Sequence, residues 1–145
     1  MTTLLLALLA ACGGNLQTQE APNGDFEEPS DEDAPVITFA PITDAQPDGV
    51  AVEITATIDD GEDGTGVLFV YLRYKNETGS ADDYRDALMT SDGGTTWTGM
   101  IPGDAADGSA GVFYYIEAVD GNDNTSYSPT RGIDDPYHYR VYAQD

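Results

Sequence analysis

The sequence predicts an all-β domain, a two-layer sandwich of seven strands, and three observations support this. From residue 34 onward, short runs rich in β-branched and aromatic residues recur, with clusters of Gly, Asn, Asp and Ser between them. Several runs alternate apolar and polar residues, as a strand with one buried face does. No run has a convincing helical pattern. At 145 residues the chain has room for one such domain and a short extension.

The strongest strand signal lies at residues 111–120, between Gly111 and a Gly-Asn-Asp-Asn turn. Its alternate residues form two faces: Val112, Tyr114, Ile116 and Ala118 on one, and Phe113, Tyr115, Glu117 and Val119 on the other. Both faces are largely apolar, which suits a central strand. We therefore predict that this strand lies in the middle of the sandwich.

The other six strands are predicted at residues 35–41, 50–58, 67–74, 84–89, 95–101 and 137–142. The second of these alternates most clearly, and we expect one set of its residues to face the core: Val50, Val52, Ile54, Ala56 and Ile58. Residues 67–74 are apolar on both faces, as in another central strand. Residues 84–89 and 95–101 are predicted to pair across a turn at residues 91–94.

The domain resembles the fibronectin type III family and its bacterial immunoglobulin-like relatives over residues 34–143. Three segments carry the resemblance: Tyr114-x-Ile116-x-Ala118-x-Asp120, Val70-x-Leu72-x-Tyr74 and Ser128-Pro129. The first is similar to the Tyr-x-Val-x-Ala-x-Asn/Asp run of the family's sixth strand. The family's tryptophan on the second strand is missing here. The resemblance implies an immunoglobulin-like sandwich over residues 34–145, a fold that serves mostly in adhesion, spacing or docking.

A short apolar run at residues 4–11 ends at Cys12, the only cysteine. The run is too short to cross a bilayer, which takes about 20 apolar residues, and its length suits a signal peptide. Leu9-Ala10-Ala11-Cys12 resembles the lipobox of bacterial lipoproteins. The resemblance implies a signal peptide at residues 1–11, an acylated Cys12 and, with Gly13 after it, anchoring in the outer membrane. The alternative is an apolar segment that ends in an incidental cysteine.

Charge is strongly unbalanced, with 27 acidic residues, five basic residues and a net charge of −22. Residues 12–33 contain seven acidic groups and no basic one, so we expect a disordered, self-repelling tether. The composition excludes binding of nucleic acid through a basic patch, because phosphate contacts require Lys and Arg.

Two acidic loops are candidates for a calcium site. The predicted topology brings them to one pole, and they contain Asp59, Asp60, Glu62 and Asp63, and Asp120, Asn122 and Asp123. Calcium takes six to eight oxygen ligands, which such side chains supply. The second loop also resembles the Asp-x-Asn-Asp-Asn linker of cadherins. The alternative is a pair of solvated turns in an acidic protein.

Residues 90–97 match the Asp-box motif, Ser/Thr-x-Asp-x-Gly-x-Thr-Trp. We expect the Asp92 carboxylate to accept hydrogen bonds from turn amides, the glycines to supply positive φ, and Trp97 to pack beneath the hairpin. Asp-boxes recur in sialidase propellers, away from the catalytic residues. One copy in a chain this short predicts a stabilised hairpin only.

The outer side of the central sheet is the candidate docking surface. If Tyr114 faces the core, this side exposes Phe69, Tyr71, Arg73, Phe113, Tyr115, His138, Arg140 and Tyr142. Aromatic residues and Arg are enriched at binding hot spots, and a large exposed apolar patch usually marks an interface. The alternatives are that the tether or residues 121–135 cover this side, or that the inside–outside phase is wrong on one strand.

The sequence therefore predicts a non-enzymatic, lipid-anchored envelope protein whose sandwich docks a protein partner or serves as an accessory subunit. His138 is the only histidine, and no nucleophile elbow or His-rich metal motif is present. No cofactor is required. The alternative function is a calcium-dependent carbohydrate-binding or adhesion module.

Replacing Cys12 with Ser should abolish incorporation of radiolabelled palmitate, because acylation of lipoproteins begins at this thiol. Loss of the acyl chains, each worth about 0.8 kcal/mol per buried methylene, should also release the protein from membranes. Labelling that survives the substitution would contradict anchoring at Cys12.

Overall fold

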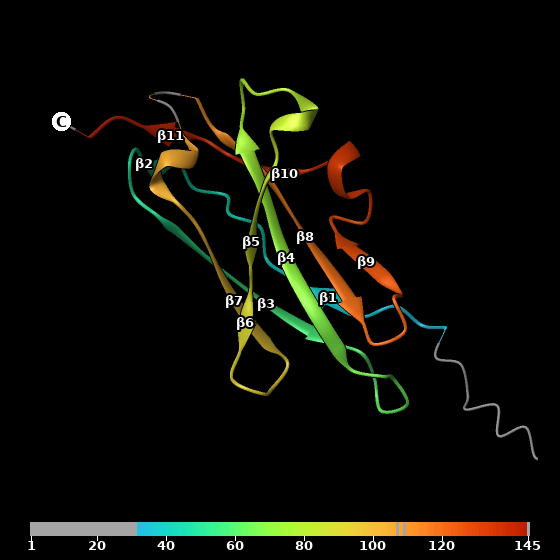
Figure 1. Cartoon of the computed structure of the whole chain (residues 1–145). Helices are drawn as coiled ribbons and strands as arrows, with labels where there is room; N and C mark the ends of the chain where they lie inside the picture. Colours follow the sequence, from blue (N-terminus) through green and yellow to red (C-terminus); the bar gives the residue numbers. More distant parts are fainter. Residues whose placement is uncertain (1–31, 107, 109, 145) are drawn as a thin grey trace, which may run out of the picture.

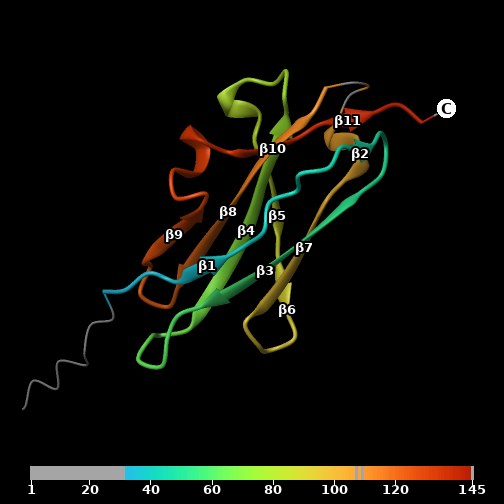
Figure 2. The same cartoon turned by 180° about the vertical axis from the view of Figure 1, so that it is seen from behind.

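The computed structural model of the chain describes residues 32–106, 108 and 110–144. They form a β-sandwich of mainly antiparallel strands, without an α-helix in the described residues (Figures 1 and 2). No helix in this part of the chain is long and apolar enough to cross a membrane. The predicted signal peptide, Cys12 and all but the last two residues of the predicted tether lie outside the described residues.

The first sheet has the order β1-β3-β7-β6 and lies in front in Figure 2. Its strands are β1 (Val36–Thr38), β3 (Val52–Asp59), β7 (Thr96–Ile101) and β6 (Thr90–Ser91). β3 pairs with β7 from Val52 to Thr57. Its alternating sequence puts every second residue in the core, as predicted.

The second sheet has the order β10-β8-β4-β5 and lies in front in Figure 1. Its strands are β10 (Tyr137–Tyr139), β8 (Val112–Asp120), β4 (Val67–Asn76) and β5 (Arg85–Leu88). β9 (Thr125–Ser128) also pairs with β8. β8 therefore has partners along both edges, which confirms its predicted central position.

The smaller elements lie around these sheets. β2 (Gln46–Pro47) and β11 (Val141–Tyr142) form a parallel two-stranded ribbon. Three short 3-10 helices are η1 (Ala81–Asp83), η2 (Gly103–Ala105) and η3 (Gly132–Asp134). We call the end of the sandwich with the β3–β4 loop, the β6–β7 hairpin and the β8–β9 turn the lower pole, as it lies in Figure 1.

The core between the sheets follows the predicted phase on the three longest strands. Its buried residues include Val52, Ile54, Ala56 and Ile58 from β3, Val70, Leu72 and Tyr74 from β4, and Val112, Tyr114, Ile116 and Ala118 from β8. The prediction for Val50 is wrong. This residue precedes β3 and is 45% exposed.

The structure divides the described chain into eleven strands, where seven were predicted. The predicted pairing of residues 84–89 with residues 95–101 is wrong for β5, which pairs with β4 instead. The chain then crosses between the sheets at Met89, whose amide donates to the Val70 carbonyl oxygen at 2.8 Å and whose side chain is buried. Only β6, after this crossing, pairs with β7.

The predicted strand at residues 137–142 is also divided. β10 pairs with β8, and after Arg140 the chain joins the separate ribbon as β11. β9 lies within residues 121–135, where the sequence predicts no strand, because Thr-Ser-Tyr-Ser lacks an apolar alternation.

Tyr114 is the aromatic centre of the upper half of the core. Its ring contacts Phe39, Tyr137 and Tyr139, with centroid distances of 6.1, 5.4 and 5.8 Å. Its hydroxyl oxygen accepts a hydrogen bond from the Ile42 amide at 3.0 Å, which fixes the chain between β1 and β2. Burial raises the pKa of Tyr114 to about 12.

Replacing Tyr114 with Phe should lower the free energy of unfolding by about 1 kcal/mol, because the Ile42 amide loses its acceptor while the ring packing is kept. Chemical denaturation measures this difference. Tyr142, which is 51% exposed, provides the control, and Tyr142→Phe should change stability by less than about 0.5 kcal/mol. Equal stabilities of wild type and Tyr114→Phe would show that this hydrogen bond contributes nothing.

Candidate functional site

The candidate site is the side of the second sheet that faces away from the core, which we call the outer face. Alternation along β4 and β8 places the following residues on it: Phe69, Tyr71, Arg73 and Lys75, and Phe113, Tyr115, Glu117 and Val119. In the β4–β8 register Arg73 lies opposite Tyr115, and Lys75 lies opposite Phe113. Two cationic side chains of β4 therefore lie opposite two aromatic side chains of β8.

Arg73 is held at the centre of this face by two carboxylates. It pairs with Asp86 at 2.5 Å and with Glu117 at 3.1 Å, and its guanidinium lies 4.9 Å from the centre of the Tyr71 ring. Burial lowers the pKa of Arg73, but its hydrogen bonds to Asp86 and Glu117 outweigh this and raise it. The guanidinium is thus a fixed part of the face, and its charge is already paired within the domain.

Lys75 occupies the next outward position on β4. Its ammonium group lies 5.5 Å from the Tyr84 ring centre and 5.4 Å from the Phe113 ring centre. It also donates a hydrogen bond to the Gly79 carbonyl oxygen at 2.7 Å. Lys75 therefore joins β4 to the β4–β5 connection and covers two aromatic rings.

Tyr115 does not belong to the exposed surface, contrary to the prediction. Only 7% of it is accessible. Tyr84 packs against its ring at 5.2 Å and Tyr127 at 6.2 Å, and η3 lies beside the same strand. Residues 121–135 thus cover this part of the outer face, the alternative that the sequence left open. Beside Tyr115 they leave a cavity of about 280 Å³ that Arg131 and Ile133 help to line.

The exposed apolar area lies at the lower part of the face. Phe69 is 43% exposed and its ring stacks on that of Tyr71, with centroids 6.2 Å apart. Leu88, opposite Tyr71 on β5, is 58% exposed, and Leu68 at the β-bulge in β4 is 51% exposed. We call Leu68, Phe69, Tyr71 and Leu88 the apolar patch.

Three predicted members of the site lie elsewhere or at its margin. His138 on β10 pairs with Phe113, and their ring centres are 4.8 Å apart, so it lies at the upper edge of the outer face. Tyr142 belongs to β11 and Arg140 lies between β10 and β11, so neither is on this sheet. The prediction that these two residues share the face is wrong, because the chain leaves the sheet after Tyr139.

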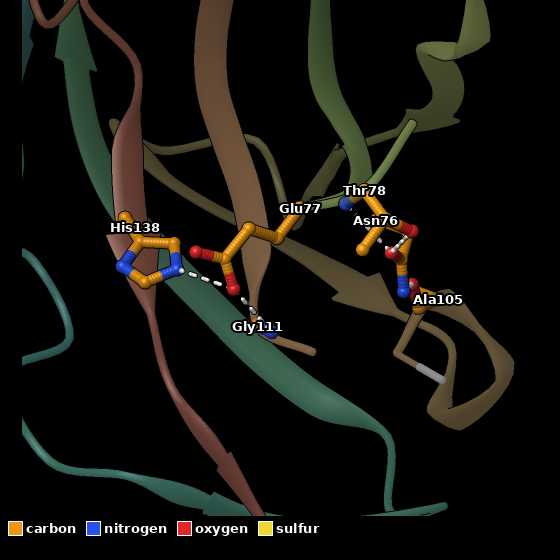
Figure 3. A network of polar contacts seen from close by, with 6 residues as sticks. All are labelled: Asn76, Glu77, Thr78, Ala105, Gly111 and His138. Atoms are coloured by element: carbon orange, nitrogen blue, oxygen red, sulfur yellow. Dashed lines mark hydrogen bonds and ion pairs between the residues drawn. The ribbon is translucent and has the colours of Figure 1, made fainter. Parts of the chain in front are cut away.

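His138 takes part in a polar network that closes the top of the sheet (Figure 3). Glu77 accepts a hydrogen bond from the Gly111 amide at 2.9 Å, and its carboxylate lies 3.6 Å from His138 Nε2. The bond from Gly111 lowers the pKa of Glu77. A side chain at position 111 would collide with the Tyr139 carbonyl oxygen, which explains the glycine. This network positions β8 against β10.

Sequence reasoning missed Lys75, Leu68 and Leu88. Lys75 could have been found, since it follows Arg73 by two residues and so shares its face. Leu88 could not, because its place depends on pairing of β5 with β4. Leu68 is exposed through a β-bulge that the alternation does not predict.

The candidate calcium loops lie side by side at the lower pole, where the Gly121 amide donates to the Gly66 carbonyl oxygen at 3.1 Å. The Asp120 carboxylate is buried and accepts three hydrogen bonds, from the Asn122 and Asn124 amides at 2.8 Å each and from Asn124 Nδ2 at 2.7 Å. In the part of the chain that the structure describes, no three Asp, Glu, His or Cys side chains are placed to hold a metal ion. Asp120 thus stabilises its turn.

The Asp-box hairpin uses a different side chain from the one predicted. The Gly93 amide donates to Ser91 Oγ at 3.2 Å, and Ser91 Oγ donates to the Gly94 carbonyl oxygen at 2.8 Å. Gly93 has a φ of 96°, as expected, but the expectation of a positive φ is wrong for Gly94. Trp97 packs against the core. Ser91 therefore has the role expected of Asp92, because its hydroxyl can both accept and donate.

No family model matches the chain, and no curated protein matches its sequence. The functional argument therefore depends on the geometry of the described residues.

Replacing Asp120 with Asn should lower the free energy of unfolding at neutral pH, because the new Nδ2 would take the place of Oδ2 and face Asn124 Nδ2, a second donor. Burial raises the pKa of Asp120, but the three hydrogen bonds outweigh it and lower the pKa below 3.8. The carboxylate's contribution is therefore present above pH 3.8 and is lost as the pH falls through the lowered pKa.

Denaturation between pH 7 and pH 2 should show wild type and Asp120→Asn converging as the pH falls. Asp92→Asn removes the same charge from the neighbouring hairpin and serves as the control, with little expected effect at any pH. A constant difference between wild type and Asp120→Asn over the whole range would contradict the assignment.

Proposed function

We propose that this protein is a lipid-anchored protein of the bacterial outer membrane whose immunoglobulin-like sandwich docks a protein partner through the outer face. The anchor rests on the lipobox resemblance at Cys12. The docking function rests chiefly on one observation, the exposed apolar patch of Leu68, Phe69, Tyr71 and Leu88. The role is non-enzymatic.

The strand order supports the immunoglobulin-like assignment. One sheet contains the first, second and fifth of the main strands (β1, β3 and β7), and the other contains β5, β4, β8 and the strands after β8. This order supports our assignment to the fibronectin type III branch, in which β8 would be the sixth strand. Tyr114, Ile116 and Ala118 of the family-like run are all buried in the core, which also supports the assignment.

The chemistry of the outer face favours a protein partner. Arg73 and Lys75 are fixed beside aromatic rings, so they can be buried by a partner without ordering long flexible chains. Phe69 and Leu88 present apolar area that the domain itself leaves in water. A central apolar cluster with fixed polar groups beside it is the usual composition of a hot spot.

The calcium-dependent carbohydrate-binding alternative has less support. It requires free oxygen ligands on the acidic loops, whereas the Asp120 carboxylate accepts three hydrogen bonds from its own turn. Calorimetric titration with calcium and envelope glycans tests it directly, and heat with both ligands would restore it.

A photo-crosslinking amino acid at position 88 should give one discrete crosslinked product in intact cells of the producing organism. Adding Phe69→Ser should reduce the crosslinked fraction about fivefold or more, because loss of a hot-spot side chain costs about 1 kcal/mol or more of binding free energy. Phe69 is 43% exposed, so the sandwich should fold without it.

Position 100 provides the matched control. Met100 is 45% exposed and lies on the opposite sheet, on β7. The same crosslinker there should give no such product. Identical products from positions 88 and 100, or none from position 88, would contradict docking at the outer face.

A further inference from the structure

A second feature of the molecule is a cleft of about 490 Å³ at the lower pole, whose lining includes no residue of the apolar patch. It lies between the β3–β4 loop and the β6–β7 hairpin. Its volume is within the range of about 300–1,000 Å³ that is typical of sites for small ligands. A single long side chain of a partner would also enter it.

The floor of the cleft is apolar and fixed. Val67 and Trp97 form it, together with Ile58, which is itself buried in the core. Trp97 packs partly against the core, and its backbone lies in the β-ladder opposite Ala56 on β3 and Ser91 on β6. The indole is therefore held in place before any ligand arrives, which lowers the entropic cost of binding.

One wall of the cleft consists of bare backbone at the hairpin. Gly93 has a positive φ and so needs to be glycine, but Gly94 does not. A Cβ atom at Gly94 would meet no atom within 4 Å. The fold would thus accept a side chain at this position, where the glycine leaves backbone alone to line the cleft.

The charged side chains that line the cleft are all acidic. Asp59 and Asp60 line the cleft, and its lining contains no Lys, Arg or His side chain. Asp59 Oδ1 accepts a hydrogen bond from the Gly61 amide at 3.0 Å, and Asp60 Oδ2 accepts one from the Gly66 amide at 2.6 Å, so both carboxylates are fixed in the loop. A neutral or anionic ligand would desolvate these charges without compensation, whereas a cation compensates them.

From these observations we infer that the cleft binds a cationic side chain, Arg or Lys, presented by a partner protein. The aliphatic stem would lie on Val67, and the charged group would lie between the Trp97 ring and the two carboxylates. Cation–π attraction is strongest for Trp, and the net charge of −22 attracts cations from a distance. This inference does not depend on the outer-face proposal.

Trp97 is the only tryptophan in the chain, so its fluorescence reports on this cleft alone. Titration of the purified full-length protein with N-acetyl-arginine amide should change this fluorescence saturably. The citrulline analogue, which has the same shape and no charge, should bind about ten times more weakly or worse. Raising the salt from about 0.01 M to about 0.15 M should weaken arginine binding, since the Debye length falls from about 30 Å to about 8 Å.

Two variants test the location. Gly94→Leu should fill the cleft and abolish arginine binding without unfolding the domain, and Asp59→Asn combined with Asp60→Asn should weaken it about tenfold or more. Glu53→Gln, which removes a charge from the exposed side of β3, is the matched control and should bind as wild type does. Phe69→Ser should also bind normally, which separates this result from the docking experiment.

Equal affinity for arginine and citrulline amides, or unchanged arginine binding by Gly94→Leu, would overturn the inference. A saturable response to neutral saccharides in place of arginine would overturn it as well, since it would assign the cleft to sugars.

Discussion

The pairing of β8 along both of its edges is the constraint on which the rest of the structure depends. β4 pairs with β8 from Val112 to Asp120, and the opposite edge is shared by β10 and β9. The inner residues of β8 form the middle of the core, and its outer residues place Phe113, Tyr115 and Glu117 between the strands that build the outer face. The strand ends at Asp120, whose carboxylate fixes the lower pole. One strand thus connects the core, the candidate docking surface and the loops.

The outer face and the lower-pole cleft differ in chemistry because they differ in how the chain satisfies its own charges. On the outer face, Arg73 is paired with Asp86 and Glu117, and apolar area is left exposed beside it. In the cleft, the carboxylates of Asp59 and Asp60 accept hydrogen bonds from backbone amides, and the lining contains no cationic side chain. A partner that binds the outer face would therefore add apolar contact, and one that binds the cleft would add positive charge. The two sites are compatible with one extended partner or with two.

The core could be predicted from the sequence because its signal is local. Alternation along β3 and β8 identifies the buried side chains without knowledge of their partners. The pairing of strands could not be predicted in the same way, because the crossing at Met89 depends on a hydrogen bond to Val70, 19 residues away. The same reason explains the error at Tyr115, whose burial depends on Tyr127 and η3 rather than on its own strand. Ser91 and Asp92 are neighbours in the sequence, and only the geometry of the hairpin decides which of their side chains accepts the hydrogen bond from the turn amide.

The strands at the edges of both sheets are short, and this has a consequence for how the protein can meet other molecules. β1, β5, β6, β9 and β10 have two to four residues each, whereas the longest strands are β3, β4 and β8. Short edges offer few consecutive backbone groups for another chain to extend the sheet. Neighbouring copies of the protein would therefore resist edge-to-edge aggregation. Recognition is left to side chains, which can be selective where backbone pairing is not.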